Sequence, residues 1–192
     1  LIEKFKGNAP LFIAGSTWPK DEELITALVT TVTLKGYKYI IAPHDIEEAR
    51  INKLQQQLGP KAQRLSQLNE NNALTTDIIL VDSIGQLTAI YAYGTIAYVG
   101  GGFNSSVHNV LEPAVYGMPV LFGPNHTKSA EAKELRTKGA AFCINNTVGL
   151  TKACNILLST DKLNSSAQVA KQYVEQRTGG TQKIWNVIAA LL

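Results

Sequence analysis

Short apolar runs alternate along most of this chain with longer segments whose apolar residues recur at helical spacing. The runs have the length of strands and are almost continuously apolar, which is typical of strands buried on both faces of a parallel sheet. Regular alternation of such strands with amphipathic helices predicts an α/β fold with helices on both faces of the sheet. The predicted strands are residues 11–14, 39–42, 64–65, 78–81, 96–99, 120–122 and 140–144.

Capping residues, prolines and glycines predict where the helices begin and end. The first of them has Ser16 or Thr17 as its cap and extends to Gly36. The expected helix starts are Pro19, Asp45, Asp82, Asn109, Lys128, Val148 and residue 161, with a break at Gly179-Gly180 in the last helix.

Ligands of such sheets bind outside the carboxyl ends of the strands, so the loops that follow the strands carry the candidate chemistry. These loops are Gly15–Pro19, Pro43–Asp45, Asp82–Gly85, Gly100–Asn109 and Gly123–Lys128.

The most informative stretch of the chain runs from Gly94 to Asn125. Its strand is followed by Gly100, Gly101 and Gly102, where the backbone can adopt conformations closed to other residues. A helix is expected from about Asn109, because a proline four residues later fits only in a first turn. The unpaired amides of that turn would face the glycine loop, and a helix start beside such a loop is typical of an anion site.

Three polar side chains surround this helix start, namely His108, Asn109 and Glu112. Helical spacing places both His108 and Asn109 on the same face as Glu112. Glu112 would accept hydrogen bonds from a ribose diol while the amides bind a phosphate, the division found in dinucleotide folds. Alternatively, Glu112 only complements the helix dipole.

The other loops leave a similar choice open. Ser16 and Thr17 could bind an anionic group together with backbone amides, or they only cap the next helix. Pro43 and His44 could contact a base, or His44 is an exposed loop histidine. Lys128 could neutralise an anion or be a solvated surface lysine.

Length and composition restrict the class of protein. With 192 residues and 45% hydrophobic content, the chain predicts one domain with or without a small appendage. A net charge of +3 without a Lys/Arg run argues against a nucleic-acid partner.

Cys143 and Cys154 give no disulfide framework and are expected to be buried apolar residues. No apolar run approaches the roughly 20 residues that span a bilayer, and no signal peptide is visible. The start at Leu1 rather than Met leads us to expect a piece of a longer protein.

The sequence also lacks several known motifs. The glycine stretch misses the last glycine of the dinucleotide fingerprint, and there is neither a GK[ST] phosphate loop nor a G-x-S-x-G elbow. The histidines lack metal-ligand spacing, and no Asp-x-Asp pair could hold a metal beside a diphosphate. A nucleotide site without metal or cofactor, built from helix amides, remains.

Five segments between Leu11 and Asn146 carry a family resemblance, in the same order as in the family: GSTW, IIAPHD, VDSIGQL, AYVGGGFNSSVHNVLEPAVYGMPVLFGPN and the helix that follows. They resemble the C-terminal half of 3-deoxy-D-manno-octulosonic acid (Kdo) transferase. The resemblance implies a GT-B glycosyltransferase with two Rossmann-like halves, of which this one binds the donor, CMP-Kdo. It also implies a lipid A precursor as acceptor, in lipopolysaccharide biosynthesis at the cytoplasmic face of the bacterial inner membrane.

The resemblance implies roles for two of the loops. Gly15, Ser16 and Thr17 match the family's Gly-Ser-Thr loop, which is expected near the sugar or the phosphate. Pro43 and His44 match its proline–basic loop, which is expected beside the cytosine.

The glycine loop and the residues after it complete the implied donor site. Gly101 and Gly102 match the family's glycine loop. His108, Asn109 and Glu112 match its Gly-His-Asn-x-Leu-Glu element, in which Asn109 and Glu112 would face the ribose and the phosphate.

On this interpretation residues 1–10 are a lead-in or linker and residues 11–160 a nucleotide-sugar-binding Rossmann-like domain. Residues 161–192 are C-terminal helices that pack on the missing N-terminal half or on this domain. The catalytic carboxylate and the acceptor site belong to the N-terminal half, so the fragment, itself soluble, is predicted to be inactive alone. Two alternatives remain: the UDP-sugar-binding half of a GT-B-like epimerase or another glycosyltransferase, and an α/β module without a ligand.

Overall fold

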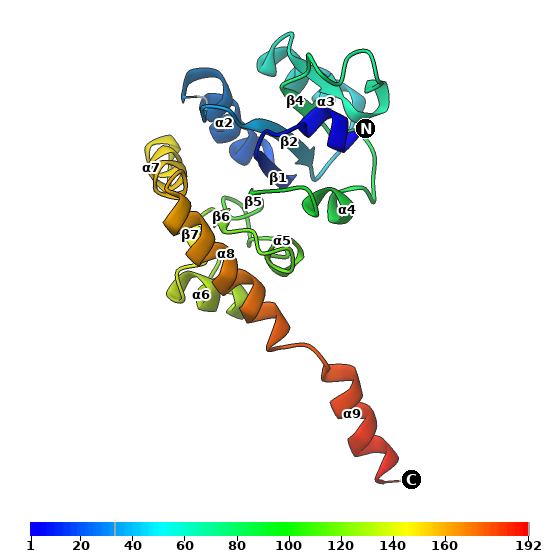
Figure 1. Cartoon of the computed structure of the whole chain (residues 1–192), viewed down its shortest axis with the longest axis vertical. Helices are drawn as coiled ribbons and strands as arrows, with labels where there is room; N and C mark the ends of the chain where they lie inside the picture. Colours follow the sequence, from blue (N-terminus) through cyan, green and yellow to red (C-terminus); the bar gives the residue numbers. More distant parts are fainter. Residues whose placement is uncertain (33, 192) are drawn as a thin grey trace.

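A parallel seven-stranded sheet forms the centre of the molecule in the computed structural model, which describes residues 1–32 and 34–191 (Figure 1). The predicted α/β fold and all predicted strands are confirmed, with ends that agree or differ by up to three residues. The strands are β1 (Leu11–Thr17), β2 (Lys38–Pro43), β3 (Ala62–Arg64), β4 (Ile78–Leu80), β5 (Ile96–Val99), β6 (Val120–Phe122) and β7 (Ala141–Cys143). Every neighbouring pair in the order β3-β4-β2-β1-β5-β6-β7 is parallel.

Helices cover both faces of this sheet. They are α1 (Ile2–Lys6), α2 (Pro19–Ala27), α3 (Glu48–Leu58), α4 (Leu87–Tyr91), α5 (Leu111–Ala114), α6 (Ala130–Thr137), α7 (Thr147–Leu157), α8 (Thr160–Glu175) and α9 (Gly180–Ala189). A π-helical turn, Leu28–Val32, continues α2, and a 3₁₀ turn, Leu65–Gln67, follows β3.

Alternate side chains of each strand point to opposite faces and build the two layers of the core. In β1, Phe12 packs with apolar residues of α2, α3 and α7, whereas Ile13 packs on the other face with α1 and α4. Further along that second face, Val120 and Phe122 of β6 pack with α5, α6 and α8. The sheet is therefore enclosed by apolar side chains on both faces, as its almost continuously apolar strands predict.

Several predicted helix starts are wrong, because the residues expected to cap them bond elsewhere. Helix α3 begins at Glu48 rather than near Asp45, whose carboxylate instead accepts from the amide of Glu47 in a local turn. Helix α4 begins at Leu87, because Asp82 accepts from the amide of Ser66 across the sheet edge. At the start of α2, the cap is Trp18 rather than Ser16 or Thr17.

The first ten residues are not an irregular lead-in. They include α1, whose Phe5 is fully buried beside Leu11 and Ile13 of β1. The amide of Phe5 also donates to the carbonyl of Leu1. This segment is part of the packed domain.

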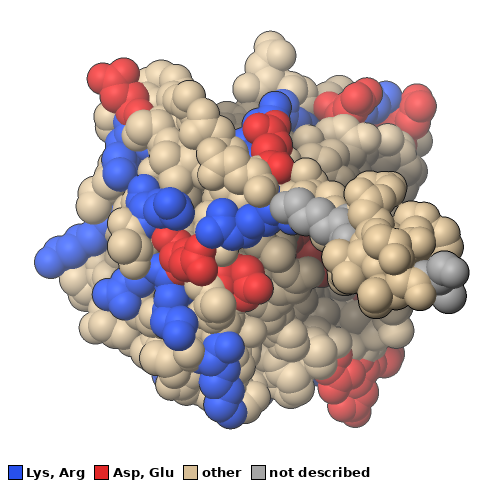
Figure 2. Space-filling model, turned by 90° about the horizontal axis from the view of Figure 1, so that it is seen from below, with Lys and Arg blue, Asp and Glu red and all other residues tan. Residues whose placement is uncertain are grey.

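The two C-terminal helices differ in how they pack. Helix α8 contributes Ala170 and Tyr173 to the core beside β6, so it belongs to this domain. Helix α9 projects away from the sheet in Figure 1, and Ile184, Trp185 and Val187 are exposed on it. Seen from below, the part of α9 that is drawn in colour consists of uncharged residues, whereas the face beside it has interspersed basic and acidic side chains (Figure 2).

The order of the strands fixes where a ligand site can form. The chain runs from β1 to β2 and on to the edge strand β3, returns to place β4 between β3 and β2, and then places β5 on the other side of β1. At such a switch point, the loops after the two central strands diverge and leave a crevice at their carboxyl ends. The predicted Gly-Ser-Thr loop forms the carboxyl end of β1 and the glycine loop follows β5, so the topology brings these two predicted elements together.

Candidate functional site

The glycine loop after β5 lies directly against the backbone of its neighbours. A Cβ atom at Gly100 would lie 2.2 Å from the carbonyl oxygen of Ser16, and one at Gly102 would lie 2.6 Å from the amide nitrogen of Gly123. Gly101 and Gly102 are both buried. The glycines therefore allow three strand-end loops to approach within backbone contact, a structural role that the sequence alone does not separate from ligand contact.

The carboxyl end of β1 turns sharply at Ser16. This residue has a φ of 53° and is the only non-glycine residue in the left-handed region among those the structure describes. The pairing of β1 with β2 shifts register between Gly15 and Thr17, so Ser16 bulges out of the strand and is partly exposed. A strained backbone at the carboxyl end of a central strand is typical of functional loops.

Thr17 and Gly15, which were both predicted to contact the nucleotide sugar, face the interior of the domain instead. Thr17 is fully buried, and its hydroxyl donates to Oε1 of Glu22 at 3.1 Å. Arg50 of α3 donates to the same Glu22 oxygen at 2.6 Å and to the carbonyl of Thr17 at 3.2 Å. Gly15 is buried against the hydroxyl of Tyr91. Of this loop, Ser16 is the predicted residue that reaches the surface.

Three rings from three loops meet at the carboxyl edge of the sheet. The indole nitrogen Nε1 of Trp18 donates to Nε2 of His108 at 3.0 Å, and the two rings are nearly coplanar, at 5°. His44 stacks on both rings, at 4.5 Å from the Trp18 centroid and 4.7 Å from that of His108. Pro43 is buried, whereas His44 is exposed. The structure thus brings the two predicted histidines into contact with each other and with Trp18, which the sequence analysis missed.

Helix α5 is shorter than predicted and begins at Leu111 rather than near Asn109. Two of the amides expected to face a ligand have protein partners: that of His108 donates to the carbonyl of Gly100 and that of Leu111 to Oδ1 of Asn109. The expectation that unpaired amides of this first turn face the glycine loop is therefore wrong for His108 and Leu111. The side-chain nitrogen of Asn109 donates to Glu112 at 3.1 Å, as their helical spacing predicts.

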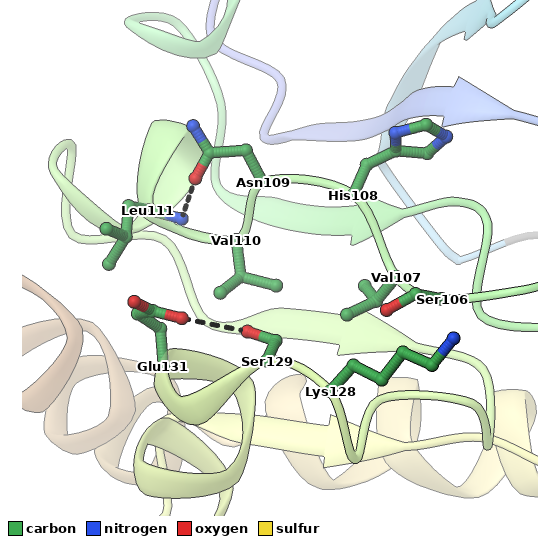
Figure 3. A pocket seen from close by; sticks show the side chains of 9 residues that line it. All are labelled: Ser106, Val107, His108, Asn109, Val110, Leu111, Lys128, Ser129 and Glu131. Carbon is green, nitrogen blue, oxygen red and sulfur yellow. Dashed lines mark hydrogen bonds between the residues drawn. The ribbon is translucent and has the colours of Figure 1, made fainter.

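A cavity of about 410 Å³ opens beside this segment (Figure 3). Residues 106–111 form one wall and Lys128, Ser129 and Glu131 the other. Figure 3 shows Lys128 reaching along the lower wall, and Ser129 hydrogen-bonded to Glu131. Backbone groups, the ammonium group of Lys128 and the serine hydroxyls in the cavity can bind an anionic ligand, whereas the carboxylate of Glu131 opposes it.

The environment favours a neutral imidazole at His108. Burial lowers the pKa of His108, the nearby His44 lowers it further, and the carboxylates of Asp21 and Glu112 oppose both effects in part. The Trp18 donor has the same consequence, because it requires an unprotonated Nε2.

Two absences concern the described residues alone. Within residues 1–32 and 34–191, no three His, Cys, Asp or Glu side chains are grouped so that they could hold a metal ion. In the same part of the chain, none of the helices has the length and apolarity needed to cross a bilayer.

The parallel sheet, with its loops converging at the switch point, defines the class of protein. The chain has the architecture of one Rossmann-like half of a GT-B glycosyltransferase. Its resemblance to Kdo transferases is confirmed. The curated 3-deoxy-D-manno-octulosonic acid transferase of Aquifex aeolicus is 37% identical over 164 residues, which cover 83% of this chain and 44% of that protein. The enzyme of the same name from Chlamydia trachomatis serovar A is 29% identical over 185 residues, 93% of this chain and 42% of the relative.

A solved structure supports the fold. The C-terminal CMP-Kdo binding domain of WaaA from Acinetobacter baumannii matches with a TM-score of 0.70 at 24% identity, over 88% of this chain and 93% of that domain. No family model matches the chain. The chain spans less than half the length of these two curated relatives, 44% and 42%.

Proposed function

We propose that this chain is the donor-binding domain of a metal-independent, inverting glycosyltransferase that transfers Kdo from CMP-Kdo to a lipid A precursor. The observation that carries the proposal is the convergence of His44, His108 and the Asn109–Glu112 pair at the switch point between β1 and β5. Similarity to curated Kdo transferases over most of the chain supports it.

In this proposal the cytidine and the phosphate occupy different parts of the site. The base lies at the loop of Pro43 and His44, where an exposed imidazole offers a flat face. Glu112 accepts from the ribose hydroxyls, with Asn109 holding the carboxylate in place. The phosphoryl group lies in the cavity beside residues 106–111, where Lys128 supplies positive charge.

These groups would act on the departing nucleotide. Hydrogen-bond donors that the protein holds in place before the reaction stabilise the negative charge that develops on the CMP phosphate as the bond to Kdo breaks. The catalytic base and the acceptor site lie in the other half of the enzyme, which acts at the inner membrane on its lipid acceptor. Closure of the two halves would bring the acceptor hydroxyl to the donor. This chain alone is therefore expected to bind CMP without transferring sugar.

Titration calorimetry with CMP and UMP at millimolar concentrations tests the proposal directly. We expect heat with CMP and a weaker response with UMP. Glu112→Ala should weaken CMP binding by roughly 10- to 150-fold, since a hydrogen bond to a charged group contributes roughly 1.5–3 kcal/mol. Glu175→Ala, at the C-terminal end of α8, serves as the charge-matched control. Absence of heat with CMP would contradict the proposal, and a preference for UMP would point to a UDP-sugar instead.

A second part of the proposal concerns α9. Its exposed apolar face, which includes Ile184, Trp185, Val187 and Ile188, packs on the other half of the enzyme. The greater length of the relatives supports this, because they contain chain that this sequence does not match.

A further inference from the structure

Asp21, in the first turn of α2, is fully buried. Its Oδ2 accepts from the amide of Trp18 at 2.9 Å and from that of Gly101 at 3.0 Å, while Oδ1 accepts from the hydroxyl of Tyr98 at 2.6 Å. A buried carboxylate is costly unless donors surround it, and these three donors meet that need. They come from the loop after β1, from β5 and from the glycine loop.

These bonds exceed what a helix cap requires. A capping interaction would need only the amide of Trp18, three residues away along the chain. Gly101 and Tyr98 lie 80 and 77 residues away in sequence, on the other side of the switch point. One carboxylate therefore ties together the two loops that flank the candidate donor site.

The connection continues outward through the side chain of Trp18. Asp21 holds the backbone of Trp18, and the indole N–H of Trp18 bonds to Nε2 of His108. Because an indole N–H can only donate, Nε2 of His108 is the acceptor and its proton lies on Nδ1. The same two rings support His44 from one side, while His44 remains exposed.

We propose that Asp21 is a positioning residue for the donor site: it fixes Trp18 against the glycine loop, and Trp18 fixes His108 and His44. This inference rests on the proposed function for the identity of the ligand. It does not depend on that function for the link from Asp21 to His108, which the two hydrogen bonds of Trp18 make by themselves.

Three variants distinguish a positioning role of Asp21 from a general contribution to the stability of the fold. Each is made in a Trp185→Phe background, so that Trp18 is the only tryptophan. Asp21→Asn keeps all three bonds, because the amide oxygen can accept from both backbone amides and the amide nitrogen can donate to the Tyr98 oxygen. Asp21→Ala removes all three. Tyr98→Phe removes one bond but leaves both loop amides held, so it is the matched control.

The readouts are the near-ultraviolet circular dichroism of Trp18 and the ¹⁵N shifts of His108, both without nucleotide, and the CMP dissociation constant. Asp21→Ala should alter the Trp18 signal, mix the His108 tautomers and weaken CMP binding about tenfold or more. Asp21→Asn and Tyr98→Phe should keep the tautomer and bind CMP within about threefold of the parent.

A folded Asp21→Ala variant with unchanged Trp18 and His108 signals would overturn the inference. If that variant does not fold, Trp18→Phe decides: it keeps a ring in place but removes the donor, so mixed His108 tautomers are expected, and an unchanged Nδ1–H tautomer would overturn the link. If the parent protein binds no CMP, the proposed function fails, while the ligand-free signals still decide whether Asp21 positions His108.

Discussion

His108 shows how one residue can couple the site to pH. Burial and the neighbouring His44 lower its pKa in the folded protein, so the unfolded chain binds a proton at a higher pH than the folded chain does. Stability must then rise with pH in the window between the two values, and it falls as the pH drops below the ordinary value of about 6.5. Protonation also ends the bond from Trp18, because Nε2 loses its lone pair.

Urea unfolding at pH 7.5 and pH 5 measures this effect. We expect the parent protein to lose more stability between these values than His108→Gln, since glutamine does not titrate and its carbonyl can still accept from Trp18. His126 and all carboxylates are common to both proteins and serve as internal controls. Equal losses in the two proteins would show that His108 is not held neutral.

The second prediction at the residue scale concerns Gly100. Alanine at this position would place its Cβ 2.2 Å from the backbone oxygen of Ser16, and neither partner is a flexible side chain. Gly100→Ala should therefore destabilise the protein by about 1–3 kcal/mol in urea unfolding and weaken CMP binding, because the two loops must separate. Gly180→Ala, which has nothing within 4 Å of the added Cβ, should be neutral or slightly stabilising. A neutral Gly100→Ala would show that the loops are not packed as described.

At the scale of elements, a substitution in α1 tests whether residues 1–10 belong to the packed domain. Phe5→Ala should cost about 3–5 kcal/mol in urea unfolding, because it leaves a cavity beside β1 in a fully buried site. Leu1→Ala, at a side chain that is 58% exposed, should change stability by less than about 0.5 kcal/mol. If Phe5→Ala were as mild as Leu1→Ala, residues 1–10 would be the linker that their polar composition suggests.

The sequence predicted strands better than helix starts, for a physical reason. A run such as Ile96–Val99 is apolar because both faces of the sheet bury it, and that signal is local. An aspartate that could cap a helix can also form other hydrogen bonds. Asp82 accepts from Ser66, 16 residues away, and Asp45 accepts from a nearby amide in a local turn. No local pattern distinguishes these outcomes.

The candidate site shows the same limit. The glycine loop and the pairing of Asn109 with Glu112 follow from spacing along the chain. The ring contacts of Trp18 do not, because His108 is 90 residues away. The spacing of Trp18 and Asp21 did carry a local signal, that of an acid three residues after a helix cap, which could have drawn attention to Asp21.

For the whole molecule, the arrangement of the strands determines where the loops meet. Because β5 returns to the side of β1 opposite β2, the loops after β1, β2 and β5 converge on one edge, whatever their sequences. The polar residues of those loops then decide which ligand binds there. This is why the class of protein follows from the fold, whereas the proposed specificity for CMP depends on a few side chains.

The last prediction concerns α9, the element that leaves this domain. Ile184 and Ile188 are 64% and 45% exposed, so replacing both with glutamate should change the unfolding free energy of the 192-residue chain by no more than about 0.5 kcal/mol. In a full-length transferase containing this segment, the same pair should lower the melting temperature and the transfer rate, because two charges would be buried in the contact with the other half. Thr181→Glu and Gln182→Glu, polar positions of the same helix, are the control for added charge.

Acrylamide should quench the fluorescence of Trp185 freely in the 192-residue chain and poorly in the full-length transferase. Strong destabilisation of the short chain by the double variant would mean that this face packs on its own domain, and the proposed docking would fail.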